Sequence, residues 1–465
     1  MTEIAQSRVH APKRESAWAE FIKKDDWWAI WIGLGLVAVA AGLVAGGGSL
    51  KWLAVAPQKW KAWPDAVSQL REHAAQYLAL FALWATLFGI GVSALGYKLS
   101  RFLPAFALLY VVTLGLYLLG QWEQASHYNL EPPLVALVIG LLIANTVGVP
   151  KWADAGLRVE LYIKTGIVLL GASLPLTLIA WAGPVAIVQA AIVSLVTFGV
   201  IYITAIRLGL DRRLAATLGT GGAVCGVSGA IATAGAVGAR KEHASIAISL
   251  VIFWAILAIF ILPLLARGLH LPTGVAGAWI GTSEFADAAG LAAAQAYGGY
   301  AAGHVAGITG NPDAAVNAFT LMKVIGRDVW IGVWAFVLSI VATTRWQATG
   351  IRSKANPGEI WRRFPKFVLG FLIASAIVTV ISSGYSYADY KKVVQPSLVA
   401  PLQVLRVWAF TFTFLAIGLT TRFREFFTGG AKPFYAFTAG VAVNVVLGYL
   451  LSTQVFVGFW TRFGQ

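Results

Sequence analysis

Long apolar stretches separated by short polar connections run along most of the chain. A bilayer core is crossed by a helix of roughly 17–25 mainly apolar residues, and stretches of about this length predict about thirteen spans when one interrupted segment counts as a single pass. They lie at 27–45, 77–96, 102–120, 132–149, 161–180, 184–206, 214–238, 244–266, 274–298, 314–344, 366–384, 398–420 and 434–456. The pattern predicts an all-α polytopic membrane protein.

The composition agrees with this fold class. Of 465 residues, 58% are hydrophobic and 12% are charged, with a mean hydropathy of +0.74. A soluble domain carries about 25% charged residues. The net charge of +15 does not indicate a nucleic-acid partner, because the basic residues lie in the short connections between spans, where they set topology.

The distribution of Lys and Arg predicts the orientation. With the N-terminus inside, most of them fall in inside connections, and the short outside loops hold far fewer, with Arg240–Lys241 and Lys391–Lys392 as the exceptions. Basic residues concentrate in cytoplasmic loops, so we expect a multi-pass protein of the bacterial inner membrane with a cytoplasmic N-terminus and a periplasmic C-terminus.

Three regions follow from this pattern. Residues 1–26 are expected to form a cytoplasmic tail without a cleaved signal peptide, 27–125 an N-terminal extension of helices and a surface loop, and 126–465 a transporter unit. The connection 46–76, with Trp52, Trp60 and Trp63, lies along the outer membrane surface or forms a flexible hydrophilic connector; both interpretations stay open.

A weak internal repeat is visible in two glycine pairs. Gly171 is followed by Gly183 within LLGASLPLTLIAWAG, and Gly418 is followed by Gly430 within LAIGLTTRFREFFTGG. In the predicted topology the spans at 161–180 and 398–420 run in opposite directions. Opposite directions are what inverted repeats require, so we expect inverted repeats.

The interrupted segment Gly219–Gly229 combines five glycines with Thr220, Cys225 and Ser228. Unpaired main-chain groups are tolerated within a membrane only where protein or a water-filled cavity surrounds them. Half-helix ends there provide partial charges for an ion, so Thr220, Gly221, Gly222, Cys225, Gly226 and Ser228 are predicted to bind an anion. The alternative is a close-packing face of small residues.

Two further segments place ionisable groups inside spans, where each costs at least about 2.5–3.5 kcal/mol. Glu284 and Asp287 follow Ser283 with i, i+3 spacing, and Lys323 and Arg327 have i, i+4 spacing, so each pair is expected to share a helix face. In one interpretation they form a buried salt bridge between two helices. In the other, Ser283, Lys323 and Arg327 bind the anion, while Glu284 and Asp287 carry the coupling ion. Lys164 is explained by snorkelling to the interface.

Other chemistry finds little support. The sequence has no Walker loop, no HExxH and no clustered Cys and His residues. We therefore expect no catalytic residues, no metal and no cofactor, and we expect that the protein is not an enzyme.

The residues quoted above resemble the YeiH-type sulfate exporter family of bacterial secondary transporters. The match lies in GGAVCGVSGAIATAGAVGARKEHASIAI (221–248), in GAWIGTSEFADAAGLAAA (277–294), around Lys323 and Arg327, and in FLAIGLTTRFREFFTGGAKPF (414–434). The resemblance implies the fold of the cation/proton antiporter and bile-acid transporter superfamily, in which a core domain of broken, crossing helices moves against a panel domain like an elevator. Where that family commonly has Ile-His-Asp, this chain has Glu284-Phe285-Ala286, so substrate and coupling ion are not carried over.

The expected function is secondary active transport of sulfate or a related small anion, by export, coupled to H+ or Na+. The expected partners are this anion, the coupling ion, the lipid bilayer and a second copy of the chain in a homodimer. A cation/proton antiporter and a non-transporting membrane sensor or scaffold are the alternatives.

Overall fold

The computed structural model describes residues 21–123, 132–174, 176–346, 365–386, 389–425 and 430–464. Every regular element within these ranges is a helix. The predicted tail before residue 21 and most of the polar connection before residue 365 lie outside the described residues.

The helices follow the predicted spans closely in most of the chain. In order they are α2 (Asp25–Ala45), α3 (Trp63–Glu72), α4 (Ala74–Ala94), α5 (Leu99–Gly120), α7 (Pro132–Thr146), α8 (Val159–Gly171), α9 (Leu176–Arg207), α10 (Arg212–Ala223), α11 (Val227–Val237), α12 (Lys241–Gly268), α13 (Thr273–Ser283), α14 (Asp287–Ala302), α15 (Pro312–Thr320), α16 (Trp330–Arg345), α18 (Phe367–Ser383), α20 (Ala400–Thr420), α21 (Ala431–Leu450) and α22 (Val457–Phe463). π-Helical turns η3 (Leu321–Arg327), η4 (Tyr390–Val399) and η6 (Leu451–Val455) join α15 to α16, precede α20 and extend α21.

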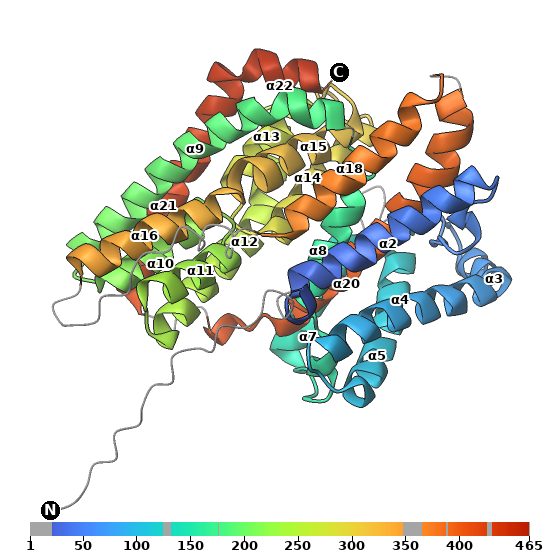
Figure 1. The fold of residues 1–465 in the computed structure, drawn as a ribbon, viewed down its shortest axis with the longest axis horizontal. Helices are drawn as coiled ribbons and strands as arrows, with labels where there is room; N and C mark the ends of the chain where they lie inside the picture. The colour runs from blue at the N-terminus through green and yellow to red at the C-terminus, as the bar shows by residue number, and fades with distance from the viewer. Residues whose placement is uncertain are drawn as a thin grey trace, which may run out of the picture.

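The helices form two bundles, which lie side by side in Figure 1. We call the first the scaffold bundle; it contains α2, α4, α5, α7, α8, α18 and α20. The second, the hairpin bundle, contains α9 to α16, α21 and α22. Helix α2 packs against α8 and α18, so the N-terminal helices are part of the scaffold bundle.

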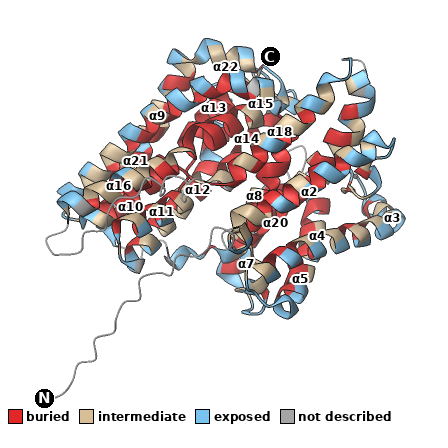
Figure 2. Cartoon of the chain, viewed as in Figure 1, coloured by how far each residue is buried: buried red, intermediate tan, exposed pale blue. Residues whose placement is uncertain are grey.

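The outer surfaces of both bundles are apolar. Large apolar side chains are exposed on each: Val111 and Val380 on the scaffold bundle are 65% and 71% exposed, and Leu195 on the hairpin bundle is 59% exposed. Buried residues concentrate on α13, α14, α8 and α20, between these outer faces (Figure 2). Eight helices in the described residues are long and apolar enough to cross a membrane. Exposed apolar side chains of this size fit a lipid surface.

Helices α10 and α11 form a re-entrant hairpin instead of one pass. The Arg213 guanidinium donates to the Gly238 carbonyl at 2.9 Å, and the Thr220 hydroxyl lies 3.4 Å from the Gly229 carbonyl oxygen. In a single helix, residues nine positions apart would be separated by about 13 Å, at 1.5 Å per residue. The chain therefore turns back at Val224–Gly226, and both ends of the hairpin lie on one side of the molecule.

Helices α13 and α14 form a second hairpin. The Tyr297 hydroxyl near the end of α14 donates to the carbonyl of Leu271, just before α13, at 2.5 Å. The turn lies at Glu284–Ala286. Helix α12 has 28 residues and joins the base of the first hairpin to the base of the second, so the two hairpins enter from opposite sides. The predicted passes at 214–238 and 274–298 are corrected accordingly.

This correction changes the side of two connections. Arg240–Lys241, an exception to the positive-inside pattern in the predicted topology, now lies on the same side as the end of α9. Arg267, at the end of α12, moves to the opposite side. Since two passes are lost, every segment after the second hairpin keeps its predicted orientation.

Cysteine labelling checks the hairpins. In a Cys225→Ser background, we expect Arg212→Cys and Glu242→Cys, at the two ends of the first hairpin, to react with a membrane-impermeant maleimide from the same side, because both positions are exposed. Asp313→Cys, beyond the second hairpin, is the control and should react only from the opposite side. Labelling of the first two positions from opposite sides would show that 212–238 crosses the membrane.

The packing of α7, α8, α18 and α20 has the pattern that an inverted repeat produces. Gly171 of α8 packs on the main chain of Phe371 in α18, and Gly418 of α20 packs on the main chain of Gly140 in α7. A two-fold relation that exchanges α7 with α18 and α8 with α20 maps one contact onto the other.

The contact of α9 with α21 supports the same relation. Gly171 and Gly418 are 247 positions apart, which is also the separation of Thr197 and Asn444, joined by a hydrogen bond of 3.0 Å. Equivalent residues of two repeats touch each other only beside the axis that relates them. The contact thus places the pseudo-two-fold axis between α9 and α21.

Two smaller expectations also differ from the structure. The predicted span 161–180 is divided, because α8 ends at Gly171 and α9 begins at Leu176. The connection 46–76 is folded rather than flexible: it contains α3, and the Trp60 indole donates to the Leu118 carbonyl at 2.7 Å.

Candidate functional site

The turn of the first hairpin depends on a glycine. Gly226 has φ 73° and ψ −106°, a conformation that residues with a Cβ rarely adopt. The position of a Cβ there would also overlap the Phe285 carbonyl oxygen of the second hairpin. The tips of the two hairpins are therefore in direct main-chain contact near the middle of the bundle.

The tip of the second hairpin is stabilised by its own carboxylate. Glu284 is fully buried, and its Oε1 accepts hydrogen bonds from the N–H groups of Phe285 at 2.9 Å and Ala286 at 3.2 Å. Its backbone is extended, at φ −81° and ψ 137°, so it lies in the break. The expectation that Glu284 and Asp287 share a helix face is therefore wrong, because α14 begins only at Asp287.

Lys323 and Arg327 hold the two tips together. The Lys323 ammonium donates to the carbonyls of Val224 at 3.2 Å and Glu284 at 2.9 Å. The Arg327 guanidinium donates to Thr282 at 2.8 Å, to Glu284 at 2.9 Å and to Gly222 at 3.0 Å. Both side chains are fully buried in η3. As predicted from their spacing, both side chains reach the two hairpin tips. There they donate hydrogen bonds to main-chain carbonyls that helix ends leave unpaired.

Three carboxylates surround these two cations. Glu284 caps its own tip, Asp287 Oδ1 lies 3.7 Å from the Lys323 ammonium, and Asp328 follows Arg327 directly. Asp328 is fully buried, and neither of its carboxylate oxygens has a hydrogen-bond partner among the described residues. The buried salt bridge considered from the sequence exists for Lys323 and Asp287, but most donors of the cations go to the main chain.

A cavity of about 240 Å³ lies where the hairpin tips face the scaffold bundle. From the tips it is lined by Cys225, Val227, Ser228, Ala286 and Asp287; from α8 by Glu160, Ile163 and Lys164; and from α20 by Phe414, Ile417 and Thr420, with Thr421 directly after that helix. Helices α11 and α14 both begin at its wall, with Val227 and Asp287 as their first residues.

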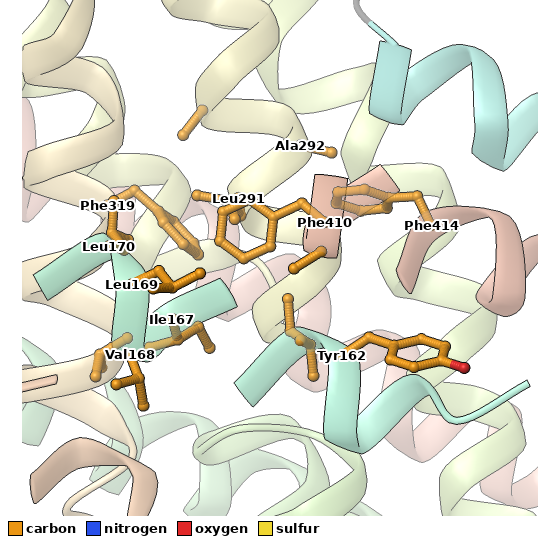
Figure 3. Packing of buried hydrophobic residues seen from close by; sticks show 14 of the residues in the cluster. Tyr162, Ile167, Val168, Leu169, Leu170, Leu291, Ala292, Phe319, Phe410 and Phe414 are labelled. Atoms are coloured by element: carbon orange, nitrogen blue, oxygen red, sulfur yellow. The ribbon is translucent and has the colours of Figure 1, made fainter. Parts of the chain in front are cut away.

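The apolar part of the boundary between the bundles adjoins this cavity. Side chains of α8, α14, α15 and α20 gather there in one cluster (Figure 3). Among them are Ile167 to Leu170, Leu291, Ala292, Phe319, Phe410 and Phe414. Two of the four helices belong to each bundle, so this apolar cluster joins the two bundles.

The predicted site residues divide into two groups in the structure. Cys225, Ser228 and Asp287 line the cavity. The others lie behind it. The Thr220 hydroxyl donates to the Ala216 and Thr217 carbonyls, Gly221 packs against Val251, and Gly222 lies beside Ile201. The remaining members of this group are Gly226, Ser283, which is fully buried, Glu284, Lys323 and Arg327. The second group builds the tips that the first group presents.

Sequence reasoning missed other members of the cavity wall. Glu160, Thr420 and Thr421 line it, and so does Lys164, which had been explained by snorkelling. The Lys164 ammonium lies 2.7 Å from Asp26 Oδ1 and 3.1 Å from Glu160 Oε2. The i, i+4 spacing of Glu160 and Lys164 was a signal in the sequence for that pair.

Together, the apolar outer surface, the two opposed re-entrant hairpins and the cavity between two bundles define a polytopic membrane protein with a buried polar site. The family model described as conserved hypothetical protein 698 matches residues 104–437, and the chain belongs to this family. The predicted resemblance is consistent with that result.

Relatives in other bacteria carry the name UPF0324 membrane protein. One from Nitratidesulfovibrio vulgaris is 34% identical over 83% of this chain and 64% of its own length, and one from Rhodopirellula baltica is 32% identical over 88% and 72%. One from Nitrosomonas europaea is 27% identical over 87% and 89%. The chain thus spans slightly less than two thirds of the Nitratidesulfovibrio relative. No solved structure matches the chain.

Proposed function

We propose that the protein is a secondary active transporter that exports a small oxyanion, sulfate or a related ion, across the bacterial inner membrane. The observation that carries the proposal is the cavity at which both hairpin tips and the scaffold bundle meet. Membrane transporters bind substrate near the midplane at discontinuous helices whose N-termini point at anionic groups.

The cavity offers the donors that an oxyanion needs. The first N–H groups of a helix have no acceptor within the helix, and the helix dipole makes them a favourable site for negative charge. Helices α11 and α14 begin at the cavity, and the Ser228 hydroxyl lies beside the first residue of α11. In this proposal Lys323 and Arg327 hold these helix starts in position and add positive charge behind them.

The charges of the tips suggest how transport is coupled. Glu284, Asp287 and Asp328 outnumber Lys323 and Arg327, and four of these five side chains are fully buried. Uncompensated charge is costly inside a membrane, so the cluster is balanced when one carboxylate takes up a proton or when Na+ binds. We propose Asp287 for this role, because it is the one of the three that lines the cavity.

The boundary between the bundles supports alternating access by an elevator movement. The apolar side chains of α8 and α20 face those of α14 and α15, which allows sliding with little loss of polar contacts. The scaffold bundle corresponds to the panel domain in this proposal and the hairpin bundle to the core domain.

The side on which α2 begins is cytoplasmic, since the Lys98, Arg101, Lys151 and Arg158 side chains gather there. A homodimer stays a prediction.

Flux into proteoliposomes tests the function. We expect Asp287→Asn to reduce gradient-driven sulfate transport at least about tenfold, while sulfate exchange across the same membrane continues. Asparagine cannot take up or release a proton, so the substitution removes coupling but not sulfate binding. The control is Asp313→Asn, which replaces an exposed aspartate outside the cavity and should leave both rates unchanged.

Two results would contradict the proposal. If the proteoliposomes exchange Na+ for H+ and carry no oxyanion, the carboxylates of the cavity, Glu160 and Asp287, bind the transported ion and the protein is a cation antiporter. If no solute is transported and none raises the unfolding temperature, the sensor or scaffold function is favoured, since a ligand that binds the folded state stabilises it.

A further inference from the structure

A second cavity lies next to the first, on the side where α2 begins. It has a volume of about 350 Å³ and is lined by Lys23, Lys24, Asp25, Asp26, Lys164 and Lys366, and by Ser228. We call it the vestibule. Among the described residues that line it, four lysines outnumber two aspartates. An oxyanion that enters from this side is attracted by these lysines before it reaches the hairpin tips.

Lys164 lies between the vestibule and the cavity at the hairpin tips, which we call the inner cavity. It lines both of them, as Ser228 does. Its side chain is 13% exposed, and it is the one cationic side chain among the described residues that line the inner cavity. Ser228 belongs to the first turn of α11, so the ammonium of Lys164 and the helix start face the same space from opposite bundles.

Acidic partners hold Lys164 in place. Asp26 Oδ1 is 2.7 Å away and Glu160 Oε2 is 3.1 Å away. Asp26 is itself held in place, because its Oδ2 accepts the Lys366 N–H at the start of α18 at 2.7 Å. Asp26 belongs to α2, which precedes the segment that the family model matches. The N-terminal helix therefore supplies a charged group at the entrance to the site.

We propose that Lys164 is an anion-binding residue of the inner cavity and that Asp26 is its internal counter-anion. When an oxyanion binds, the Lys164 ammonium moves from Asp26 to the oxyanion. The inference rests on the proposed function. A lysine ammonium has three donors and turns freely on a flexible stem. Substrate on the cavity side and Asp26 on the vestibule side compete for it, so Asp26 sets the affinity through Lys164 and acts as a positioning residue.

The competition predicts effects of opposite sign. Binding of sulfate, thiosulfate and phosphate to the full-length protein in detergent is measured by calorimetry and by the shift of the unfolding temperature. We expect Lys164→Gln to weaken binding of the preferred anion at least about tenfold, since a charge-assisted contact is lost. We expect Asp26→Asn to strengthen binding several-fold, because the competitor is removed. Lys164→Arg keeps the charge and should restore most of the affinity.

Glu160→Gln provides a second variant, with the same sign as Asp26→Asn, in case Asp26→Asn does not fold. If the ion pair is merely structural, Asp26→Asn and Lys164→Gln should both lower the unfolding temperature, and the dissociation constant of the anion should not shift in opposite directions in the two variants. That result overturns the inference. If the wild-type protein binds an anion and Lys164→Gln binds it equally well, only this inference fails. If the wild type binds none of the three anions, the proposed function fails with it.

Discussion

Replacing Arg327 with methionine is expected to lower the free energy of unfolding by about 3–5 kcal/mol, the cost of removing one partner from a buried charged network. The guanidinium donates to the carbonyls of Thr282, Glu284 and Gly222. Methionine has similar length and no donor, so three buried carbonyls lose a partner and Asp328 loses an adjacent cation. The measurement is thermal or denaturant unfolding of the protein in detergent.

The control for this variant is Arg462→Met. Arg462 is exposed and donates to a carbonyl of its own helix, that of Gly458, so its loss should change the free energy of unfolding by less than about 0.5 kcal/mol. Arg327→Lys should lie between wild type and Arg327→Met, because one ammonium cannot reach the three carbonyls in the same fork geometry. Equal stability of Arg327→Met and Arg462→Met would show that the tips do not depend on Arg327.

Replacing Gly226 with alanine is expected to lower the free energy of unfolding by about 2–6 kcal/mol. A residue with a Cβ in this sparsely populated backbone region, at φ 73° and ψ −106°, costs about 1–3 kcal/mol, and overpacking adds about 1–3 kcal/mol. The Cβ would overlap the Phe285 carbonyl oxygen and crowd Val251. We expect transport to be lost as well, because the two tips must separate to admit the methyl group.

Gly209→Ala is the matched control. Gly209 has φ +77°, close to that of Gly226, but its Cβ would have no neighbour within 4 Å. Its substitution should cost only the backbone contribution of a positive φ, so a larger loss in Gly226→Ala reports the contact between the tips together with the ψ of −106° at Gly226. Should Gly209→Ala and Gly226→Ala destabilise the protein equally, the tips are not tightly packed in solution.

The sequence predicted most helices because their length and apolar character are local properties. It could not distinguish a crossing helix from a hairpin of two half-length helices, since α10 and α11 together fill the same apolar stretch as one span. Arg240–Lys241 carried the missing signal. These residues violated the positive-inside pattern in the predicted topology, and they obey it once the preceding segment turns back.

The site was predictable to a similar extent. An interruption within Gly219–Gly229 was predicted from glycine and small polar residues in an apolar segment, and Cys225 and Ser228 of the cavity wall with it. Asp287 was identified as an ionisable residue inside a predicted span. The partners of Lys323 and Arg327 could not be, because they are main-chain carbonyls, which leave no trace in residue identity. Lys164 was misinterpreted because its partner Asp26 lies far away in the sequence and only α2 packing against α8 brings them together.

The arrangement of η3 limits how the protein can move. One helix turn carries the two side chains that bond to both tips, so neither hairpin can swing away from the other without breaking hydrogen bonds of Lys323 or Arg327. A pair of flaps that open in turn would have to break them in every cycle. Opening must then take place where the first hairpin and α14 meet the scaffold, which makes cross-links between α14 and α8 or α20 the means to trap the protein on one side.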